Sequence, residues 1–582
     1  MTTTRPFPRC FTIVTFAVSF ILPGTVLAES PHAPQERFPQ VEQHRLESAH
    51  GIVAADHRYA SEAGAEILAQ GGNAADAGVV AMLVLGITHP FASGLGGGGF
   101  CLYHEAEVGE TTVLDFREIA PAKAHRDLYA VDGEVDHGLA RRGGLAVATP
   151  GEPAGLWSLH GRFGHLPWED LFEGPRRLAE QGFPVGATLA EAIEQRADDF
   201  VDFPELAAVF QDEQGTYLTE GDLLVRDDLV RALEVLETHG VHPFYAGEVA
   251  QAIAQAAQAQ GGILTVDDLA AYRLERRKPI VGEFRGMEIH SMPPPSSGGI
   301  ALIQALNLLE ALDLPENLDD PLTLHLMVEA LKHAFADRAR WLGDTDFVDV
   351  PVEKLISREY AQELAQRVDL DQVLETEEYG TIAPDPEAAG TAHLSVVDAQ
   401  DNLLACTTTI NTRFGSMVYV PEFGLILNNE MADFNVEPGE PNIFGLIGNE
   451  QNAVAAGKRP LSSMSPTLLL RDGVPWMTLG ASGGPTIITG TYLTLLRTLV
   501  YGEDLLDAIT APRLHHQWIP ETLFVETEPF PGADHLTERG HSLSHRRAYN
   551  AVQAILRGDG HWIGVSDPRK GGVPAAPAAP PE

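Results

Sequence analysis

The chain has 582 residues, of which 44% are hydrophobic, and a formal net charge of −43. Its length predicts more than one domain, roughly three to four, and so acidic a balance excludes nucleic-acid binding, which requires a basic surface. The best apolar run beyond the N-terminus, residues 77–87, is shorter than the ~20 residues of a spanning helix, which excludes stable membrane insertion of the mature chain.

The first 28 residues have the pattern of a secretory signal. Arg5 and Arg9 precede an apolar segment, residues 11–22, and Val26-Leu27-Ala28 offers a small-residue cleavage site. We therefore expect residues 1–28 to be removed and the protein to be periplasmic or secreted. An uncleaved membrane anchor is the alternative.

Removal of the signal would leave two cysteines, Cys101 and Cys406. Two cysteines are too few for a disulfide framework. They could pair, but Cys101 follows a glycine run, Cys406 lies in a distant strand-like run, and the sequence does not place them together. We expect two buried thiols.

Several elements are predicted in chain order. Helical periodicity begins at Tyr59, stops at Gly71-Gly72 and resumes after Asn73, a predicted N-cap. Residues 93–100 form a glycine-rich turn before a short strand, and apolar residues from Leu324 to Leu342 predict a second amphipathic helix. The later predictions are an acidic exposed loop at 375–389, a hairpin with its turn at 399–402, strands at 424–427 and 476–479, a helix at 485–500 and a disordered tail at 571–582.

The transition from the acidic loop to the first strand of the hairpin falls at Gly390-Thr391. If this peptide bond were cut, Thr391 would carry both a hydroxyl nucleophile and a free α-amino group. An α-amino group titrates near pH 7.7–8 and can therefore act as the base for its own hydroxyl. A Gly-Thr pair before a strand carries little weight alone, so the rest of the sequence must support this interpretation.

Eight further stretches support it, and together with the stretch at Thr391 they resemble the γ-glutamyltransferase (γ-glutamyl transpeptidase) family from about Tyr59 to Arg569. The nine stretches are Gly94–Phe100, Asp115–Glu118, Ser291–Gly299, Ala336–Arg338, Thr391–Asp398, Asn428–Met431, Pro460–Pro466, Ser482–Gly484 and Ser566–Arg569. The resemblance implies an N-terminal-nucleophile hydrolase with an α+β fold, a four-layer αββα sandwich. It also implies self-cleavage before Thr391, giving a large subunit, residues 29–390, and a small subunit, residues 391–582, that stay together.

The substrate that the resemblance implies is a γ-glutamyl amide, whose head carries an α-carboxylate and an α-ammonium. Arg117 suits the carboxylate because guanidinium offers a planar bidentate fork. A structural ion pair with Asp115 or Glu118 is the alternative role for Arg117. The other residues that match binding positions of the family are Ser462 and Ser463 for the carboxylate, and Asn411, Glu430 and Asp433 for the ammonium.

Gly483 and Gly484 follow a predicted strand and precede Pro485, a favourable first helical residue. Their N–H groups would lie near a helix N-terminus, where negative charge is stabilised. The family uses this pair as the oxyanion hole. Thr409 matches a position that orients the nucleophile and assists self-cleavage.

The resemblance thus predicts that glutathione is the γ-glutamyl donor, that water, an amino acid or a peptide is the acceptor, and that no cofactor or metal is required. His515-His516 lacks a third ligand at suitable spacing, so we expect these histidines in the core. The residue at the position where some bacterial relatives place a lid tyrosine is Phe444. Near the C-terminus, Asn550–Gln553 replaces the Gly-Ser/Thr before Gln that is common in relatives.

Four other functions compete with this prediction. Gly480-Ala481-Ser482-Gly483-Gly484 is a G-x-S-x-G motif, with Asp507 and His515 downstream in α/β-hydrolase order, but it leaves Thr391 and Arg117 unexplained. A non-catalytic γ-glutamyl-binding protein would need a damaged nucleophile. Within the family, acylases that act on β-lactam side chains and enzymes that cut poly-γ-glutamate are further alternatives.

Overall fold

The computed structural model describes residues 1–2, 37–38, 40–379, 390–437, 439–440, 442, 446, 448, 450–547 and 550–578. The predicted signal beyond residue 2, residues 380–389 of the predicted acidic loop and Phe444 therefore lie outside the described residues. The loop prediction is wrong for residues 376–379, which form a short helix. Within the described part of the chain, no helix combines the length and apolarity that crossing a membrane requires.

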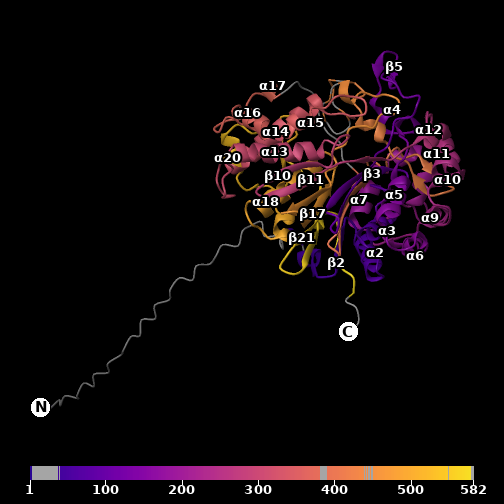
Figure 1. Ribbon diagram of the computed structural model, residues 1–582, viewed down its shortest axis with the longest axis horizontal. Helices are drawn as coiled ribbons and strands as arrows, with labels where there is room; N and C mark the ends of the chain where they lie inside the picture. The colour runs from indigo at the N-terminus through magenta and orange to yellow at the C-terminus, as the bar shows by residue number, and fades with distance from the viewer. Residues whose placement is uncertain are drawn as a thin grey trace.

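Two antiparallel sheets stack face to face at the centre of the molecule (Figure 1), and strands β12 and β13 of one pack on β17 of the other. The order in the first sheet is β1 (Arg45–Ser48), β22 (Trp562–Ser566), β21 (Ala551–Arg557), β17 (Val474–Ser482), β16 (Thr467–Arg471), β11 (Met287–Ser291) and β10 (Ile280–Phe284). The order in the second is β2 (Gly51–Ala55), β12 (Ala392–Asp398), β13 (Leu403–Thr409), β3 (Gly98–Glu105), β4 (Glu110–Phe116) and β9 (Glu275–Arg277). Both sheets thus combine strands from before and after Thr391.

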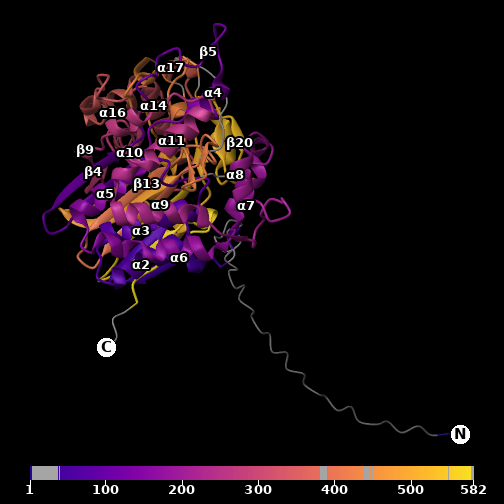
Figure 2. The ribbon, with the colours of Figure 1, turned by 90° about the vertical axis from the view of Figure 1, so that its right-hand side faces the viewer.

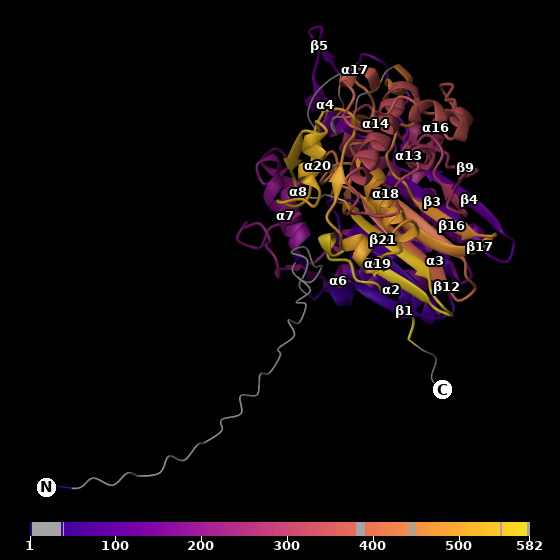
Figure 3. The ribbon, with the colours of Figure 1, turned by 90° about the vertical axis from the view of Figure 1, so that its left-hand side faces the viewer.

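Helices cover the outer face of each sheet. On the second sheet lie α2 (Arg58–Ala69), α3 (Ala74–Thr88) and α5 (Glu152–Phe163), and α6 (Glu173–Gln181) and α9 (Asp227–His239) pack outside them; these helices face the viewer in Figure 2. The opposite side, seen in Figure 3, carries α13 (Gly298–Ala311), α14 (Thr323–Trp341), α16 (Arg358–Ala365), α18 (Thr486–Leu499) and α19 (Leu505–Thr510). The layer order is helix, sheet, sheet, helix, which confirms the predicted αββα sandwich.

Shorter elements surround these layers. The helices are α4 (His137–Arg141), α7 (Ala187–Arg196), α8 (Pro204–Val209), α10 (His242–Ala246), α11 (Glu248–Ala259), α12 (Val266–Ala271), α15 (Val352–Leu355), α17 (Thr376–Tyr379) and α20 (Ala533–Glu538). The strands are β5 (Ala130–Val131), β6 (Glu134–Val135), β7 (Phe183–Pro184), β8 (Leu223–Leu224), β14 (Tyr419–Val420), β15 (Leu425–Ile426), β18 (Leu514–His515), β19 (Leu523–Val525) and β20 (Leu543–His545).

Local sequence signals account for several boundaries. Asn73 caps α3 as predicted: its side chain accepts from the N–H groups of Ala75 and Asp76, while the Asp76 carboxylate accepts from the N–H of Asn73. This capping box satisfies helix donors that would otherwise be buried without partners. The predicted hairpin is the β12–β13 pair, and the helices predicted after Tyr59, after Leu324 and at 485–500 correspond to α2, α14 and α18.

The expectation of two free buried thiols is wrong. Cys101 in β3 and Cys406 in β13 are directly opposite each other in the ladder, with Cα atoms 4.2 Å apart, and they form a disulfide. Both cysteines are buried as expected. What the sequence could not supply was the register of two strands 305 residues apart.

The prediction of a disordered tail is also wrong for residues 571–578. The N–H of Ala575 donates to the carbonyl of Val53 (2.9 Å), and the N–H of Val53 donates to the carbonyl of Ala575 (2.8 Å). The ring of His44 donates to the carbonyl of Gly572 (2.6 Å). Backbone hydrogen bonds along β2 fix this segment, and composition alone carries no signal for them.

Candidate active site

A cavity lies at the end of the central strands, where Thr391 immediately precedes β12. It collects every predicted site residue except Gly483, which adjoins it through Gly484. The lining residues are Arg117, Arg338, Thr391, Thr409, Asn411, Glu430, Asp433, Leu446, Leu461, Ser462, Ser463, Met464, Gly484 and Ile487. The structure therefore brings together side chains that are distributed over more than 360 positions of the sequence.

The register of β12 and β13 places Thr391 beside Thr409. Ala392 pairs with Thr408, so Thr391, which precedes Ala392, and Thr409, which follows Thr408, meet at the end of the ladder. The two hydroxyl oxygens are 3.4 Å apart. Thr391 is only 5% exposed, so its hydroxyl is largely shielded from bulk water.

Both hydroxyls face the peptide bond that precedes Thr391. The Thr391 Oγ1 lies 2.6 Å from the carbonyl oxygen of Gly390, and the Thr409 hydroxyl donates to the same oxygen over 2.9 Å. The N–H of Asn411 donates to the Thr409 Oγ1 (2.8 Å), which leaves the hydroxyl proton of Thr409 for Gly390. The carbonyl is thus polarised next to a potential nucleophile.

Arg117 follows β4 and is almost fully buried. Its guanidinium donates to the carboxylates of Glu430 and Asp433, and its Nε donates to the carbonyl of Pro460 (3.1 Å). Burial opposes its charge, but these carboxylates outweigh burial and raise the pKa of Arg117. Of the two alternative partners, the Asp115 side chain pairs with Arg277 (2.7 Å), whereas Glu118 lies 3.7 Å from the Arg117 guanidinium. Arg117 therefore lines the cavity and also has the Glu118 ion pair that the sequence allowed.

Glu430 and Asp433 begin and end one 3₁₀ turn, Glu430–Asp433, so that both carboxylates reach the same cation. Burial raises the pKa of each, and the positive charge of Arg117 opposes that increase. The guanidinium of Arg117 is thus the shared partner of both carboxylates. A ligand with both a carboxylate and an ammonium could insert between the guanidinium and these carboxylates, its carboxylate on Arg117 and its ammonium on the two acids, without leaving a buried charge unpaired.

Ser462 and Ser463 lie on a loop that the Ser291–Gly299 motif supports. The N–H of Ser462 donates to the carbonyl of Pro295 (2.8 Å), and the Ser297 hydroxyl donates to the carbonyl of Ser462 (2.7 Å). The proline- and serine-rich motif therefore acts as a scaffold for the serine pair.

Gly483 and Gly484 connect β17 to α18. Their φ angles are 128° and 59°, in the left-handed region that favours glycine. The Thr486 hydroxyl donates to the carbonyl of Gly483 (2.7 Å), which fixes the turn. Gly484 borders the cavity at the start of α18, where the helix dipole favours negative charge.

Two cationic residues of the site were missed. Arg338, in α14, lines the cavity and donates from Nε to Ser297 Oγ (3.1 Å), and burial lowers its pKa to about 10. Lys570 donates to the carbonyl oxygen of Thr391, to Asp56 (2.9 Å) and to Ser482 Oγ (2.8 Å). Both residues lie in or next to motifs that carried the family resemblance, and this was the one signal that could have identified them.

The arrangement does not support the G-x-S-x-G alternative. Ser482 Oγ accepts a hydrogen bond from Lys570, a cation that cannot act as a base while protonated. The two ring nitrogens of His515 contact Thr489 (2.7 Å) and Gln517 (3.0 Å) instead of the serine. His515 and His516 are buried, as the sequence predicted.

Comparison with known proteins agrees with this geometry. The family model described as Gamma-glutamyltranspeptidase matches residues 60–577. The chain belongs to the γ-glutamyltranspeptidase family. It is 40% identical to the glutathione hydrolase proenzyme of Escherichia coli (strain K12), over 95% of this chain and 97% of that protein, and 36% identical to glutathione hydrolase 2 of Arabidopsis thaliana, over 90% and 93%.

Solved structures show the same fold. The cephalosporin acylase from Bacillus halodurans superposes with a TM-score of 0.82 at 26% identity, covering 97% of this chain and all of that chain. The γ-glutamyltranspeptidase of Helicobacter pylori gives a TM-score of 0.53 at 39% identity, covering 55% of this chain and 91% of that chain. These comparisons support an N-terminal-nucleophile hydrolase or transpeptidase.

Proposed function

We propose that this protein is a γ-glutamyltransferase and glutathione hydrolase that cuts its own chain between Gly390 and Thr391. The observation that carries the proposal is the Thr391 hydroxyl, 2.6 Å from the preceding carbonyl oxygen and beside a cavity with two buried arginines and two buried acids. Export on the signal at 1–28 would leave a large subunit, 29–390, and a small subunit, 391–582. Because both sheets contain strands from each part, the subunits would stay associated after cleavage.

Self-cleavage would begin with attack of the Thr391 Oγ on the Gly390 carbonyl carbon. Thr409 would stabilise the negative charge that develops on the carbonyl oxygen. Collapse of this intermediate breaks the C–N bond and transfers the acyl group to Oγ, while the released nitrogen takes the proton. Water then hydrolyses the ester, leaving a carboxylate on Gly390 and a free α-amino group on Thr391.

The mature enzyme would use the same hydroxyl on its substrate. Thr391 Oγ attacks the γ-amide carbonyl, and the α-amino group accepts its proton and returns it to the leaving amine. The N–H groups of Gly483 and Gly484 stabilise the oxyanion. The γ-glutamyl-enzyme then passes its acyl group to water, or to an amino acid or peptide. These groups supply each step without a cofactor.

The substrate would be recognised because its two charged groups replace ion pairs that the cavity residues make with one another. The α-carboxylate of the substrate would contact Arg117, Ser462 and Ser463. Its ammonium would contact Glu430, Asp433 and the amide oxygen of Asn411. Each buried charge would thereby keep an opposite partner when substrate enters, which avoids the cost of an unpaired buried ion.

The same ion pairs favour γ-glutamyl donors over the acylase alternative that the Bacillus halodurans neighbour suggests. A glutaryl group has no ammonium, so it would draw Arg117 away from Glu430 and Asp433 without giving these acids a replacement. Initial rates with γ-glutamyl-p-nitroanilide and glutaryl-p-nitroanilide, at equal concentrations, test this choice. Faster turnover of the glutaryl compound would favour an acylase.

A denaturing gel with intact masses tests the proposal as a whole. The wild type should give two polypeptides, the smaller beginning at Thr391, whereas Thr391→Ala should remain one chain. Mass spectrometry after treatment with a γ-glutamyl-like electrophile should locate the adduct on Thr391. An uncut wild type with full activity, or an adduct on Ser482, would contradict the proposal.

A further inference from the structure

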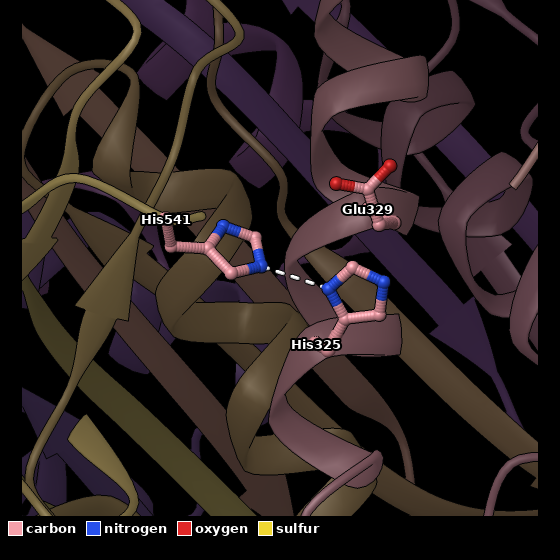
Figure 4. Close-up of side chains that lie close together, drawn as sticks. All are labelled: His325, Glu329 and His541. Atoms are coloured by element: carbon pink, nitrogen blue, oxygen red, sulfur yellow. Dashed lines mark hydrogen bonds between the residues drawn. The ribbon is translucent and has the colours of Figure 1, made fainter. Parts of the chain in front are cut away.

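Three buried side chains away from the Thr391 cavity form a second cluster (Figure 4). His325 and Glu329 lie one turn apart on α14, and His541 approaches from the loop after α20. His325 Nδ1 and His541 Nε2 are 2.8 Å apart, and one ligand atom from each of the three residues lies within 4.8 Å of the others. None of the three lines the cavity around Thr391.

The hydrogen bonds fix which nitrogen of His325 carries a lone pair. Its Nε2 lies 2.8 Å from the carbonyl oxygen of Asp369, which can only accept, so Nε2 carries the proton. The lone pair on Nδ1 therefore points toward His541. A backbone carbonyl that orients an imidazole in this way is the usual support for a metal-binding histidine. The 2.8 Å contact between the two ring nitrogens requires a lone pair on one of them, and an imidazole lone pair is what binds a metal ion.

The carboxylate of Glu329 has one oxygen unused. Tyr379 donates to Oε2, whereas Oε1 is buried and has no hydrogen-bond partner among the described residues. The Lys332 ammonium lies 3.8 Å from this Oε1, at ion-pair distance, but it is closer to the carboxylate of Glu521 (2.8 Å). A buried acceptor of this kind is costly unless a cation or a donor reaches it.

We propose that His325 Nδ1, His541 Nε2 and a carboxylate oxygen of Glu329 bind one divalent transition-metal ion, for which Zn²⁺ is the best match. Two imidazoles and one carboxylate form a recognised zinc ligand set. At Zn–N distances of about 2.05 Å, tetrahedral geometry separates the two nitrogens by about 3.3 Å, so they must move apart by about 0.5 Å. His541 would shift its proton from Nε2 to Nδ1, and the fourth position would remain for water.

The location suggests an ion that connects two parts of the chain. His325 and Glu329 precede Thr391, and His541 follows it. If the chain is cut as proposed above, the ion would join the large and small subunits. This last consequence rests on the proposed function, but metal binding itself does not, and the uncut variant Thr391→Ala should bind the ion equally well.

The test is the metal content of the full chain, purified with a tag free of histidine, incubated with Zn²⁺ and desalted. Plasma mass spectrometry should find about one zinc per chain in the wild type and in Thr391→Ala. His541→Gln should lose it, because the Gln amide can still donate to His325 Nδ1 but offers no imidazole ligand. The matched control is His535→Ala, in α20 of the same segment, where the side chain is 48% exposed.

Further measurements distinguish loss of a metal ligand from misfolding of the variant. Co²⁺ should give visible d–d absorption in the wild type and in His535→Ala, but not in His541→Gln. Circular dichroism should show that His541→Gln is folded, and added Zn²⁺ should raise the melting temperatures of the wild type, Thr391→Ala and His535→Ala but not that of His541→Gln. Equal zinc content in wild type and His541→Gln, or no zinc in either, would overturn the proposal and leave a hydrogen-bonded histidine pair.

Discussion

Replacement of Thr409 by valine should slow self-cleavage without changing the shape of the side chain greatly. In the structure the Thr409 hydroxyl donates to the carbonyl oxygen of Gly390 over 2.9 Å, and the Asn411 N–H fixes the direction of that bond. Valine keeps the branched shape but cannot donate. Loss of one preorganised donor to a developing oxyanion costs about 10²–10³ in rate, or ~2.7–4 kcal/mol in the barrier.

The assay follows the uncut fraction with time on denaturing gels, starting from precursor made by cell-free synthesis. Thr408→Val is the matched control, since the adjacent hydroxyl of β13 donates instead to Glu152 (2.8 Å), away from Gly390. Thr408→Val should cleave at close to the wild-type rate, and Thr409→Ser, which restores a donor, should recover most of it. Melting temperatures of all three variants separate slow chemistry from loss of fold.

Two results would refute this reasoning. Cleavage of Thr409→Val at the wild-type rate would mean that the hydrogen bond to Gly390 contributes nothing to the barrier. Equal slowing by Thr408→Val and Thr409→Val, with equal losses of melting temperature, would assign the effect to the packing of β13.

Three further predictions concern charge. Arg117→Lys keeps the charge but loses the planar guanidinium fork, so KM for γ-glutamyl donors should rise about tenfold or more while self-cleavage continues. Unchanged donor kinetics would give Arg117 a purely structural role. Lys570→Met should move the acid limb of the kcat/KM profile to higher pH, because the Lys570 ammonium beside Thr391 disfavours protonation of the α-amino group that cleavage gives to Thr391. An acid limb at the wild-type pH would contradict this prediction. Burial alone would raise the pKa of Glu526, but the charges of Arg569 and its neighbours lower this pKa from 4.5 to about 2. The ionised carboxylate therefore contributes fully to the free energy of unfolding above pH 4.5, and the contribution is lost as the pH falls through 2. Glu526→Gln should therefore lose ~3 kcal/mol in denaturant unfolding at pH 7, and the difference from wild type should shrink toward pH 2; a constant difference would refute the assignment.

Local features were predictable from the sequence because their causes are local. The cap at Asn73, the β12–β13 hairpin and the helix that becomes α18 each depend on residues within one turn or one strand pair. The αββα layers and most of the cavity came from ordered motifs that resemble one family. Periodicity alone would not have assembled Arg117, Glu430 and Thr391 in one place.

The disulfide shows where such reasoning stops. Cys101 and Cys406 are each at the centre of a strand, and either could face many partners. Their pairing is set by the adjacency of β3 and β13, strands separated by 305 residues. Register between distant strands is decided by the packing of the whole sheet, so no window of sequence around either cysteine contains it.

Lys570 was missed for a related reason, since the segment that positions it has the composition of a disordered tail. Asp567 accepts from the N–H of Arg569 (3.0 Å) and so fixes the turn, and the guanidinium of Arg569 binds Glu526 (2.6 Å). Beyond the lysine, Ala575 pairs with Val53 on the edge of β2. The turn is thus held on both sides, and the ammonium of Lys570 reaches Thr391 because the glycine- and proline-rich tail is ordered by backbone hydrogen bonds.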